Sequence, residues 1–155
     1  MITLDLDWMD LELAFRDTTD TESYIDRNNE ELVSVLPGFP DEIELRDMIQ
    51  IAGDQYVRIA PVNTNFSKTV LLQFIKQLSG HAILKKLELA EAGVGSYAKS
   101  IQILRQDKEV LQLYYRFEQD SLWSHILEAL ASAGIEPATS PPEPELFEEA
   151  VAAAA

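Results

Sequence analysis

The sequence predicts an α+β fold in which a small antiparallel sheet, a hairpin plus one further strand, packs on a C-terminal helical bundle. Two patterns carry this prediction. Alternating segments bounded by turn residues occur in the first 60 residues, whereas from Phe66 onward apolar residues recur at three- and four-residue steps. With 155 residues, 46% of them hydrophobic, the chain can bury one core. We therefore expect a single domain over residues 1–136.

Two short helices are predicted in the first third of the chain. Asp7 can cap the first helix, and its apolar stripe consists of Trp8, Leu11 and Phe15. Asp41 can cap the second helix, which ends near Gly53 because glycine is typical of a helix C-terminus. The apolar stripe of this second helix consists of Ile43, Met48 and Ile51.

The predicted sheet consists of a hairpin and one later strand. The hairpin strands are Tyr24–Asp26 and Leu32–Leu36, and a polar cluster containing Asn28 and Asn29 lies between them. Asparagine tolerates the positive φ that tight turns require, so this cluster predicts the turn. The alternating segment Gln55–Ala60 predicts the third strand.

From Phe66 onward the pattern predicts helices only. The first begins at a Ser67 cap and ends at Gly80, and three more follow over residues 81–93, 96–106 and 107–134. Short connections between such helices are typical of a bundle. Residues 137–155 are rich in proline, glutamate and alanine and contain no base, so we expect a largely extended acidic tail.

The net charge of −15 is unevenly distributed along the chain. Residues 1–54 contain 15 acids and three bases, residues 55–136 contain eight acids and nine bases, and residues 137–155 contain four acids and no base. Binding to nucleic-acid phosphates or to an anionic membrane needs clustered Lys and Arg, so we expect neither. No apolar run reaches the roughly 20 residues that span a bilayer, and the N-terminus is acidic rather than signal-like. We expect a cytoplasmic protein.

The segment AGVGSYAKS, residues 92–100, is one residue short of a phosphate-binding loop, because Ala98 stands where the second glycine belongs. Such a loop follows a β-strand, but here the preceding segment has helical spacing. We therefore predict that Gly93 ends one helix, that the chain turns through Gly95, and that Ser96 caps the next helix. No nucleotide binding is expected.

The remaining candidates for chemistry are few. The absence of cysteine excludes disulfides and thiolate metal sites. His81 and His125 have no carboxylate at a metal-ligand spacing, and the acids between Asp5 and Glu22 lack the order of a calcium-binding loop. The aromatic run around Tyr114 follows the apolar stripe of its helix and is assigned to the core. We therefore assign no catalytic residue, no metal and no cofactor.

Five short segments between Met9 and Pro137 share a pattern of aromatic and glycine positions: GVGSY followed by Ile101, LQLYYRFEQDSL, the hairpin YIDRNNEEL, the strand QYVRIAPV and the closing LASAGIEP. Together they resemble a bacterial group known as uncharacterised protein family number 0158. The resemblance implies that family's fold and a bacterial source. Because the family has no established activity, the resemblance implies no catalytic residue.

The distribution of charge favours a non-catalytic protein-binding or regulatory module that uses an acidic surface. Its partner would be a protein with a basic surface, and the candidate contact residues are Asp17, Asp20 and Glu22. Two alternatives stay open. One is a nucleic-acid mimic, or a blocker of a nucleic-acid-binding protein, and the other is a metal-dependent enzyme that uses the N-terminal carboxylates. We lean against an enzyme, and the sequence does not indicate an oligomeric state.

Overall fold

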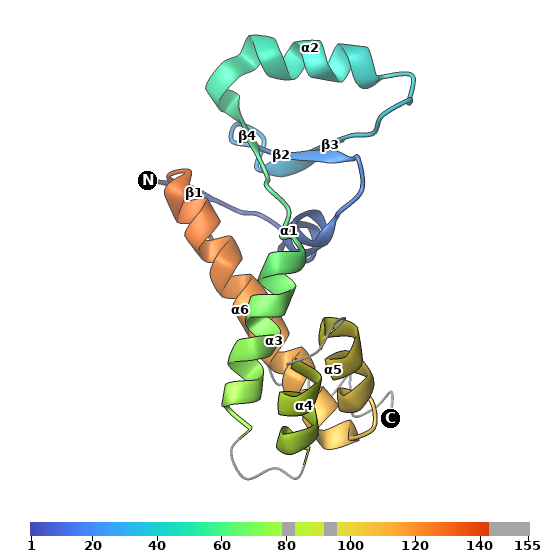
Figure 1. Ribbon diagram of the computed structural model, residues 1–155. Helices are drawn as coiled ribbons and strands as arrows, with labels where there is room; N and C mark the ends of the chain where they lie inside the picture. Colours follow the sequence, from blue (N-terminus) through green and yellow to red (C-terminus); the bar gives the residue numbers. More distant parts are fainter. Residues whose placement is uncertain (79–82, 92–95, 143–155) are drawn as a thin grey trace. The chain divides into compact units, whose positions relative to one another are not determined.

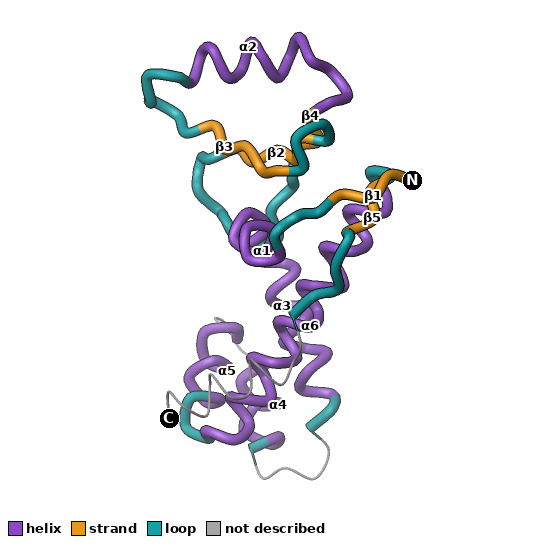
Figure 2. Tube along the Cα trace, turned by 180° about the vertical axis from the view of Figure 1, so that it is seen from behind, coloured by secondary structure: helices purple, strands orange, loops and turns teal. Residues whose placement is uncertain are grey.

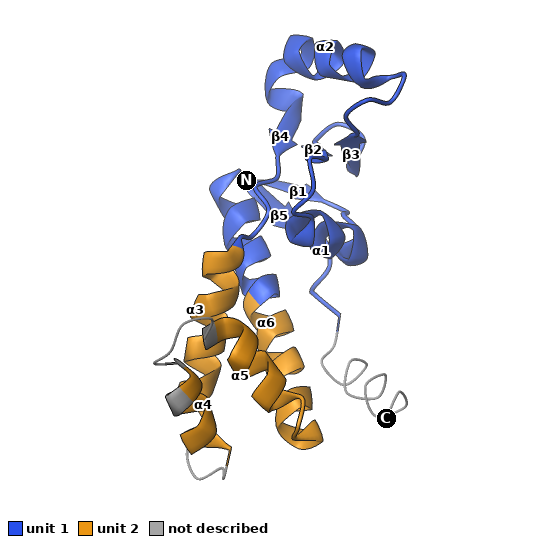
Figure 3. Ribbon diagram, turned by 45° about the vertical axis from the view of Figure 1, so that its right-hand side comes forward, with its two compact units in different colours: residues 1–63, 122–142 blue, residues 64–121, 143–155 orange. Residues whose placement is uncertain are grey.

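The computed structural model describes residues 1–78, 83–91 and 96–142 (Figure 1). Its helices and strands (Figure 2) form two compact units (Figure 3). Unit 1 consists of residues 1–63 and 122–142, and the described part of unit 2 lies within residues 64–121. The predicted α+β class is confirmed, because a three-stranded antiparallel sheet precedes C-terminal helices. The single domain predicted over residues 1–136 stays a prediction.

Unit 1 contains both sheets that the described residues form. Its elements are β1 (Ile2–Leu4), α1 (Trp8–Arg16), β2 (Glu22–Asp26), β3 (Glu31–Val35), α2 (Glu42–Ala52), the 3-10 turn η1 (Gly53–Gln55), β4 (Tyr56–Arg58) and β5 (Ile135–Pro137), and the end of helix α6 (Lys108–Ser132). In the larger sheet β2 lies between β3 and β4 and is antiparallel to both. The predicted hairpin and third strand are therefore confirmed.

The sheet β3-β2-β4 lies between α1 and α2, as Figures 1 and 2 both show. Side chains alternate between its two faces. Ser23 and Ile25 are buried on the α1 side, where the Ser23 Oγ lies 3.4 Å from the Ser34 Oγ of β3. Glu22 and Tyr24 face the other side, toward α2. The outer face of this small sheet is thus the platform on which α2 is held.

Asp26 organises the hairpin turn. Its side chain is 1% exposed, and its Oδ1 accepts hydrogen bonds from the backbone N–H groups of Asn28 and Asn29 and from the Gln55 Nε2. Its Oδ2 accepts a hydrogen bond from the Asn29 Nδ2 at 2.8 Å. Burial raises the pKa of Asp26, but these hydrogen bonds to its charged form lower the pKa by more, so that it lies below the ordinary value. The carboxylate form therefore stabilises the turn.

The conformation of this turn differs from the prediction in one respect. We expected the positive φ at an asparagine, but among the described residues the non-glycine residue with positive φ is Glu30, at 54°. The asparagines instead direct their N–H groups to Asp26, which keeps them outside the left-handed region. The turn is a four-residue loop that Glu30 closes by donating its N–H to the Asp26 carbonyl at 3.0 Å.

A parallel pair of short strands, β1 and β5, joins the two sequence segments of unit 1. Ile2 lies opposite Ile135 in this pair, and the Ala138 N–H donates to the Leu4 carbonyl at 2.8 Å. The Trp8 indole N–H also donates to the Thr139 carbonyl at 3.0 Å. The beginning of the predicted tail is thus tied to the N-terminal segment, and residues 143–155 of that tail lie outside the described residues.

The described part of unit 2 is built from helices, as predicted. They are α3 (Thr64–Lys76), α4 (Leu84–Glu91), α5 (Ser96–Leu104) and the first part of α6. Buried side chains from all four form one cluster: Leu71, Phe74, Ile75, Leu78, Ile83, Leu87, Leu104, Val110 and Tyr114. Tyr114 packs edge-on against Phe74, with 5.4 Å between ring centroids, which confirms its assignment to the core.

The predicted start of α3 was wrong. Ser67 was expected to cap this helix, but α3 begins at Thr64, three residues earlier. Phe66 is half-buried and, with Val70 and Phe74, extends the apolar stripe back by one turn. Burial of this ring explains the additional turn. The predicted end of the helix at Gly80 lies outside the described residues.

We predict that Asp26→Asn lowers the free energy of unfolding by about 2 kcal/mol, because an amide nitrogen or a weaker acceptor then faces donors that the carboxylate satisfies. Urea unfolding measures this change. Asp20→Asn, an equivalent change at an exposed loop residue, is the control and should leave the unfolding midpoint unchanged. Equal stability of the two variants would contradict the role of Asp26.

Candidate protein-binding surface

Helix α2 contains no buried residue. Leu45, Ile49 and Ala52 are half-buried on one side, whereas Ile43 is 74% exposed and Ile51 is 86% exposed. The apolar stripe noted in the sequence, Ile43, Met48 and Ile51, is therefore on the solvent side of the helix. The physical reason is that α2 carries apolar residues on both sides and the three-stranded sheet covers only one of them.

The exposed apolar residues of α2 alternate with acids. Ile43, Asp47 and Ile51 lie on one ridge of residues four apart, and Glu44 and Met48 lie beside this ridge. Glu44 and Asp47 are exposed, and Met48 is 42% exposed. We call these five residues, 43, 44, 47, 48 and 51, the α2 stripe. A surface of this composition offers apolar contact and negative charge at the same place.

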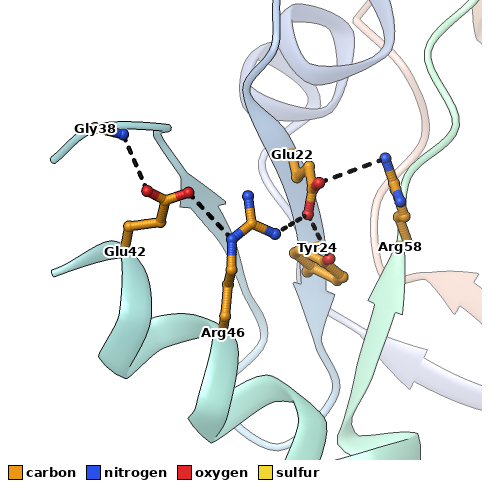
Figure 4. A network of polar contacts seen from close by, with 6 residues as sticks. All are labelled: Glu22, Tyr24, Gly38, Glu42, Arg46 and Arg58. Carbon is orange, nitrogen blue, oxygen red and sulfur yellow. Dashed lines mark hydrogen bonds and ion pairs between the residues drawn. The ribbon is translucent and has the colours of Figure 1, made fainter.

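The orientation of α2 is fixed by Arg46, whose guanidinium joins two carboxylates (Figure 4). Its Nη1 lies 2.9 Å from the Glu22 Oε2 on strand β2, and its Nε lies 3.2 Å from the Glu42 Oε1 on α2 itself. The other oxygen of Glu42 accepts the Gly38 N–H at 3.0 Å, in the loop before the helix. This network holds the half-buried side of α2 toward the sheet, which leaves the α2 stripe in solvent.

The position of the α2 cap at Asp41 was predicted correctly, but the expected hydrogen bond from the cap side chain is not formed. The Glu42 carboxylate, which accepts the Gly38 N–H, ties the helix start to the preceding loop instead. Local sequence does not distinguish these two adjacent acids.

Glu22 is the centre of the network in Figure 4. The Tyr24 hydroxyl donates to the Glu22 Oε2 at 2.9 Å, and the Arg58 Nη2 lies 3.9 Å from its Oε1. The hydrogen bond from Tyr24 and that from Arg46 lower the pKa of Glu22, and the Gly38 N–H and Arg46 lower the pKa of Glu42. Glu22 and Glu42 are therefore carboxylates at neutral pH, and both help to hold α2 in place.

The three candidate contact residues from the sequence have different environments. The Asp17 Oδ1 accepts hydrogen bonds from the Thr19 N–H at 2.8 Å and the Thr19 hydroxyl at 2.6 Å, just after α1. Asp20 is an exposed residue of the following loop, and Glu22 belongs to the network that holds α2. Asp20 and Asp17 can meet a partner without loss of a contact to Arg46, whereas Glu22 has a structural role.

Two of the pockets in the described part of the chain lie in unit 1. The first, of about 300 Å³, lies between α1 and the hairpin and includes Asp10, Leu13, Asp17 and Leu32 in its lining. The second, of about 230 Å³, is mainly apolar and is lined by Phe15, Ile25, Val57, His125, Leu130 and five further residues. Within the described ranges no three His, Asp or Glu side chains are grouped so that they could hold a metal ion.

The described residues beside the segment AGVGSYAKS form helices. Helix α4 precedes it, so a strand does not deliver the segment as a phosphate-binding loop requires. Ser96 begins α5, and Lys99 is exposed on that helix. The predicted helix end at Gly93 and the turn through Gly95 lie outside the described residues, as does His81.

The charges of unit 1 do not balance. Its residues include 17 acids and four arginines, whereas residues 64–121 include six acids and eight bases. Each arginine of unit 1 has an acceptor within the unit: Arg16 contacts Glu12, Arg27 donates to the Ala133 carbonyl at 2.7 Å, Arg46 contacts Glu22 and Glu42, and Arg58 contacts Glu22. The exposed acids of the unit therefore exceed its cations.

None of the helices in the described part of the chain combines the length and the apolarity that crossing a membrane requires.

We predict that Glu22→Gln destabilises the protein by about 1 kcal/mol at neutral pH, because Arg46 and Tyr24 lose a charged acceptor. A carboxylate whose pKa is lowered by folding stabilises the protein fully at pH values above its ordinary pKa, which is 4.5 for Glu22. That stabilisation is lost as the pH falls through the lowered pKa. The difference between wild type and variant should therefore shrink at about pH 3.

Urea unfolding at about pH 7 and about pH 3 measures this difference. Glu128→Gln, an exposed change on α6, serves as the control and should match wild type at both values. A Glu22→Gln deficit that is as large at the acidic pH as at neutral pH would show that the charge of Glu22 is not what stabilises the network.

No family model, curated protein or solved structure matches this chain. The resemblance to uncharacterised protein family number 0158 therefore stays a prediction.

Proposed function

We propose that this chain is a non-catalytic protein-binding or regulatory module of the cytoplasm, in which unit 1 binds a basic surface of another protein. One observation carries the proposal. Each arginine of unit 1 has an acceptor within the unit, while 17 acids stand against only four arginines there. The surplus negative charge is available to an external cationic partner.

The physical consequence of such a surplus is faster and more selective association. Opposed charge patches steer two proteins toward each other, and salt screens this attraction over about 8 Å at physiological ionic strength. Dissociation depends more on the contacts formed after docking. Charge steering alone therefore supplies rate and selectivity, and a defined contact surface must supply the lifetime of the complex.

We also propose that the chain belongs with uncharacterised protein family number 0158. This proposal rests on the five sequence segments between Met9 and Pro137 and on their shared aromatic and glycine positions. It adds a bacterial source and no activity.

The test is affinity capture from a lysate of the source cells, with a bait in which three exposed acids of unit 1 are neutralised, Asp20→Asn, Glu31→Gln and Glu136→Gln. The matched control removes the same number of exposed acids from unit 2, by Asp120→Asn, Glu88→Gln and Glu109→Gln. We expect wild type and control to capture a basic protein at low salt, and the unit 1 variant to capture several-fold less because steering is weakened.

Raising the salt to about 0.5 M should slow association strongly and change dissociation less, which surface plasmon resonance with the captured protein measures. Capture that is unchanged both by the unit 1 variant and by this salt concentration would contradict the proposal.

A further inference from the structure

We propose that the α2 stripe is the docking surface for a basic amphipathic helix of the partner protein. This inference rests on the proposed function and specifies where the partner binds and what its binding segment looks like. The occupant has apolar residues on one side, which cover Ile43 and Ile51, and Lys or Arg beside them, which pair with Glu44 and Asp47.

The geometry of the stripe fits such an occupant. Ile43, Asp47 and Ile51 follow each other at four-residue steps on one inclined ridge of the helix, which turns by about 80° from Ile43 to Ile51, so an apolar contact, a carboxylate and a second apolar contact follow each other along α2. Ile43 is 74% exposed and Ile51 is 86% exposed. Covering them removes more apolar area from water, and so releases more binding free energy, than covering apolar residues that are already partly buried. The apolar contacts supply the lifetime of the complex, and the acids select a cationic partner.

The surface is ordered before a partner arrives. Arg46 ties α2 to Glu22 of β2, and the Tyr56 hydroxyl lies 3.8 Å from the Met48 sulfur at the edge of the stripe. A docking partner therefore does not have to order this helix, which lowers the entropic cost of binding. Arg46 is held by Glu22 and Glu42, so it does not neutralise Glu44 and Asp47 for the stripe.

Charge argues against the other occupants available to this chain. In a dimer formed through α2, the Glu44 and Asp47 carboxylates of one copy would meet the same carboxylates of the other, and like charges across an interface oppose binding. Residues 143–155 of the chain itself contain four glutamates and no base. A cationic segment of another protein is the complementary occupant.

The probe is a synthetic helical peptide of leucine and lysine with its leucines on one face, labelled for fluorescence anisotropy. Two further peptides separate shape from charge: a scrambled peptide of the same composition, and an amphipathic peptide with glutamate in place of lysine. We expect the amphipathic cationic peptide to bind wild type, the scrambled one to bind more weakly, and the acidic one not to bind.

The stripe variant is Ile43→Gln with Ile51→Gln, since glutamine is a good helix former. Its matched control is Met9→Gln with Leu13→Gln, an exposed apolar pair four residues apart on α1. Removing two central apolar contacts should weaken binding of the amphipathic peptide about tenfold or more, and the control should bind as wild type does. Thermal unfolding of both variants verifies that they are folded.

A second measurement does not depend on any variant. Amide chemical-shift mapping on the wild-type protein should place the largest changes caused by the peptide in residues 42–52. Shifts centred on α1 or on unit 2 would overturn the inference.

Three further outcomes would also overturn it: the stripe variant binds as tightly as wild type, the scrambled peptide binds as tightly as the amphipathic one, or wild type forms a dimer that the stripe variant does not form. In each of these cases salt and the unit 1 acid variant can still reduce binding, so the proposed function survives. If neither salt nor the acid variant affects binding of the cationic peptide, the proposed function itself fails.

Discussion

The contact of Arg46 with Glu22 is the interaction on which the outer layer of unit 1 depends. Glu22 lies on β2, the central strand of the sheet, and Arg46 lies on α2, which leaves the sheet after β3 and returns to it at β4. Without this ion pair, α2 would keep three half-buried apolar residues, the contact of Glu42 with Gly38 and that of Met48 with Tyr56, but no ion pair to the sheet, and it buries no side chain completely. With it, one side of α2 is directed to the sheet and the opposite side to solvent.

The same contacts determine the charge that unit 1 presents. Arginines that bind acceptors inside the unit stabilise its fold, and within the described part of the chain Glu44 and Asp47 of α2 form no ion pair. Structural stability and the proposed interaction with a basic partner therefore have a common origin. The ion pairs of Arg46 with Glu22 and Glu42 keep the α2 stripe on the solvent side of the helix. They also engage the arginine that would otherwise offset the charges of Glu44 and Asp47.

Much of the fold could be predicted from the sequence, because periodicity and turn residues are local signals. The hairpin, the third strand and the helices after Phe66 follow from them. The pair β1–β5 could not be predicted, since its strands have three residues each and their pairing joins Ile2 to Ile135. Nor could the sequence distinguish the two sides of α2: Ile43 and Ile51 are spaced like core residues, and only the small area of the sheet and the position of Arg46 decide that they face solvent. Glu22 was predicted as a surface contact because its partner is 24 residues away.

We infer that α2 is ordered in the unbound protein with Ile43 and Ile51 of its stripe in water. Methyl NMR spectra with and without a soluble paramagnetic probe test this most directly, because the probe broadens signals of side chains that it can reach. We expect strong broadening for Ile43 and Ile51 and none for Ile25 and Ile126, which are 2% and 0% exposed. Isoleucines 43 and 51 that are as protected as Ile25, at protein concentrations where the chain is monomeric, would contradict it.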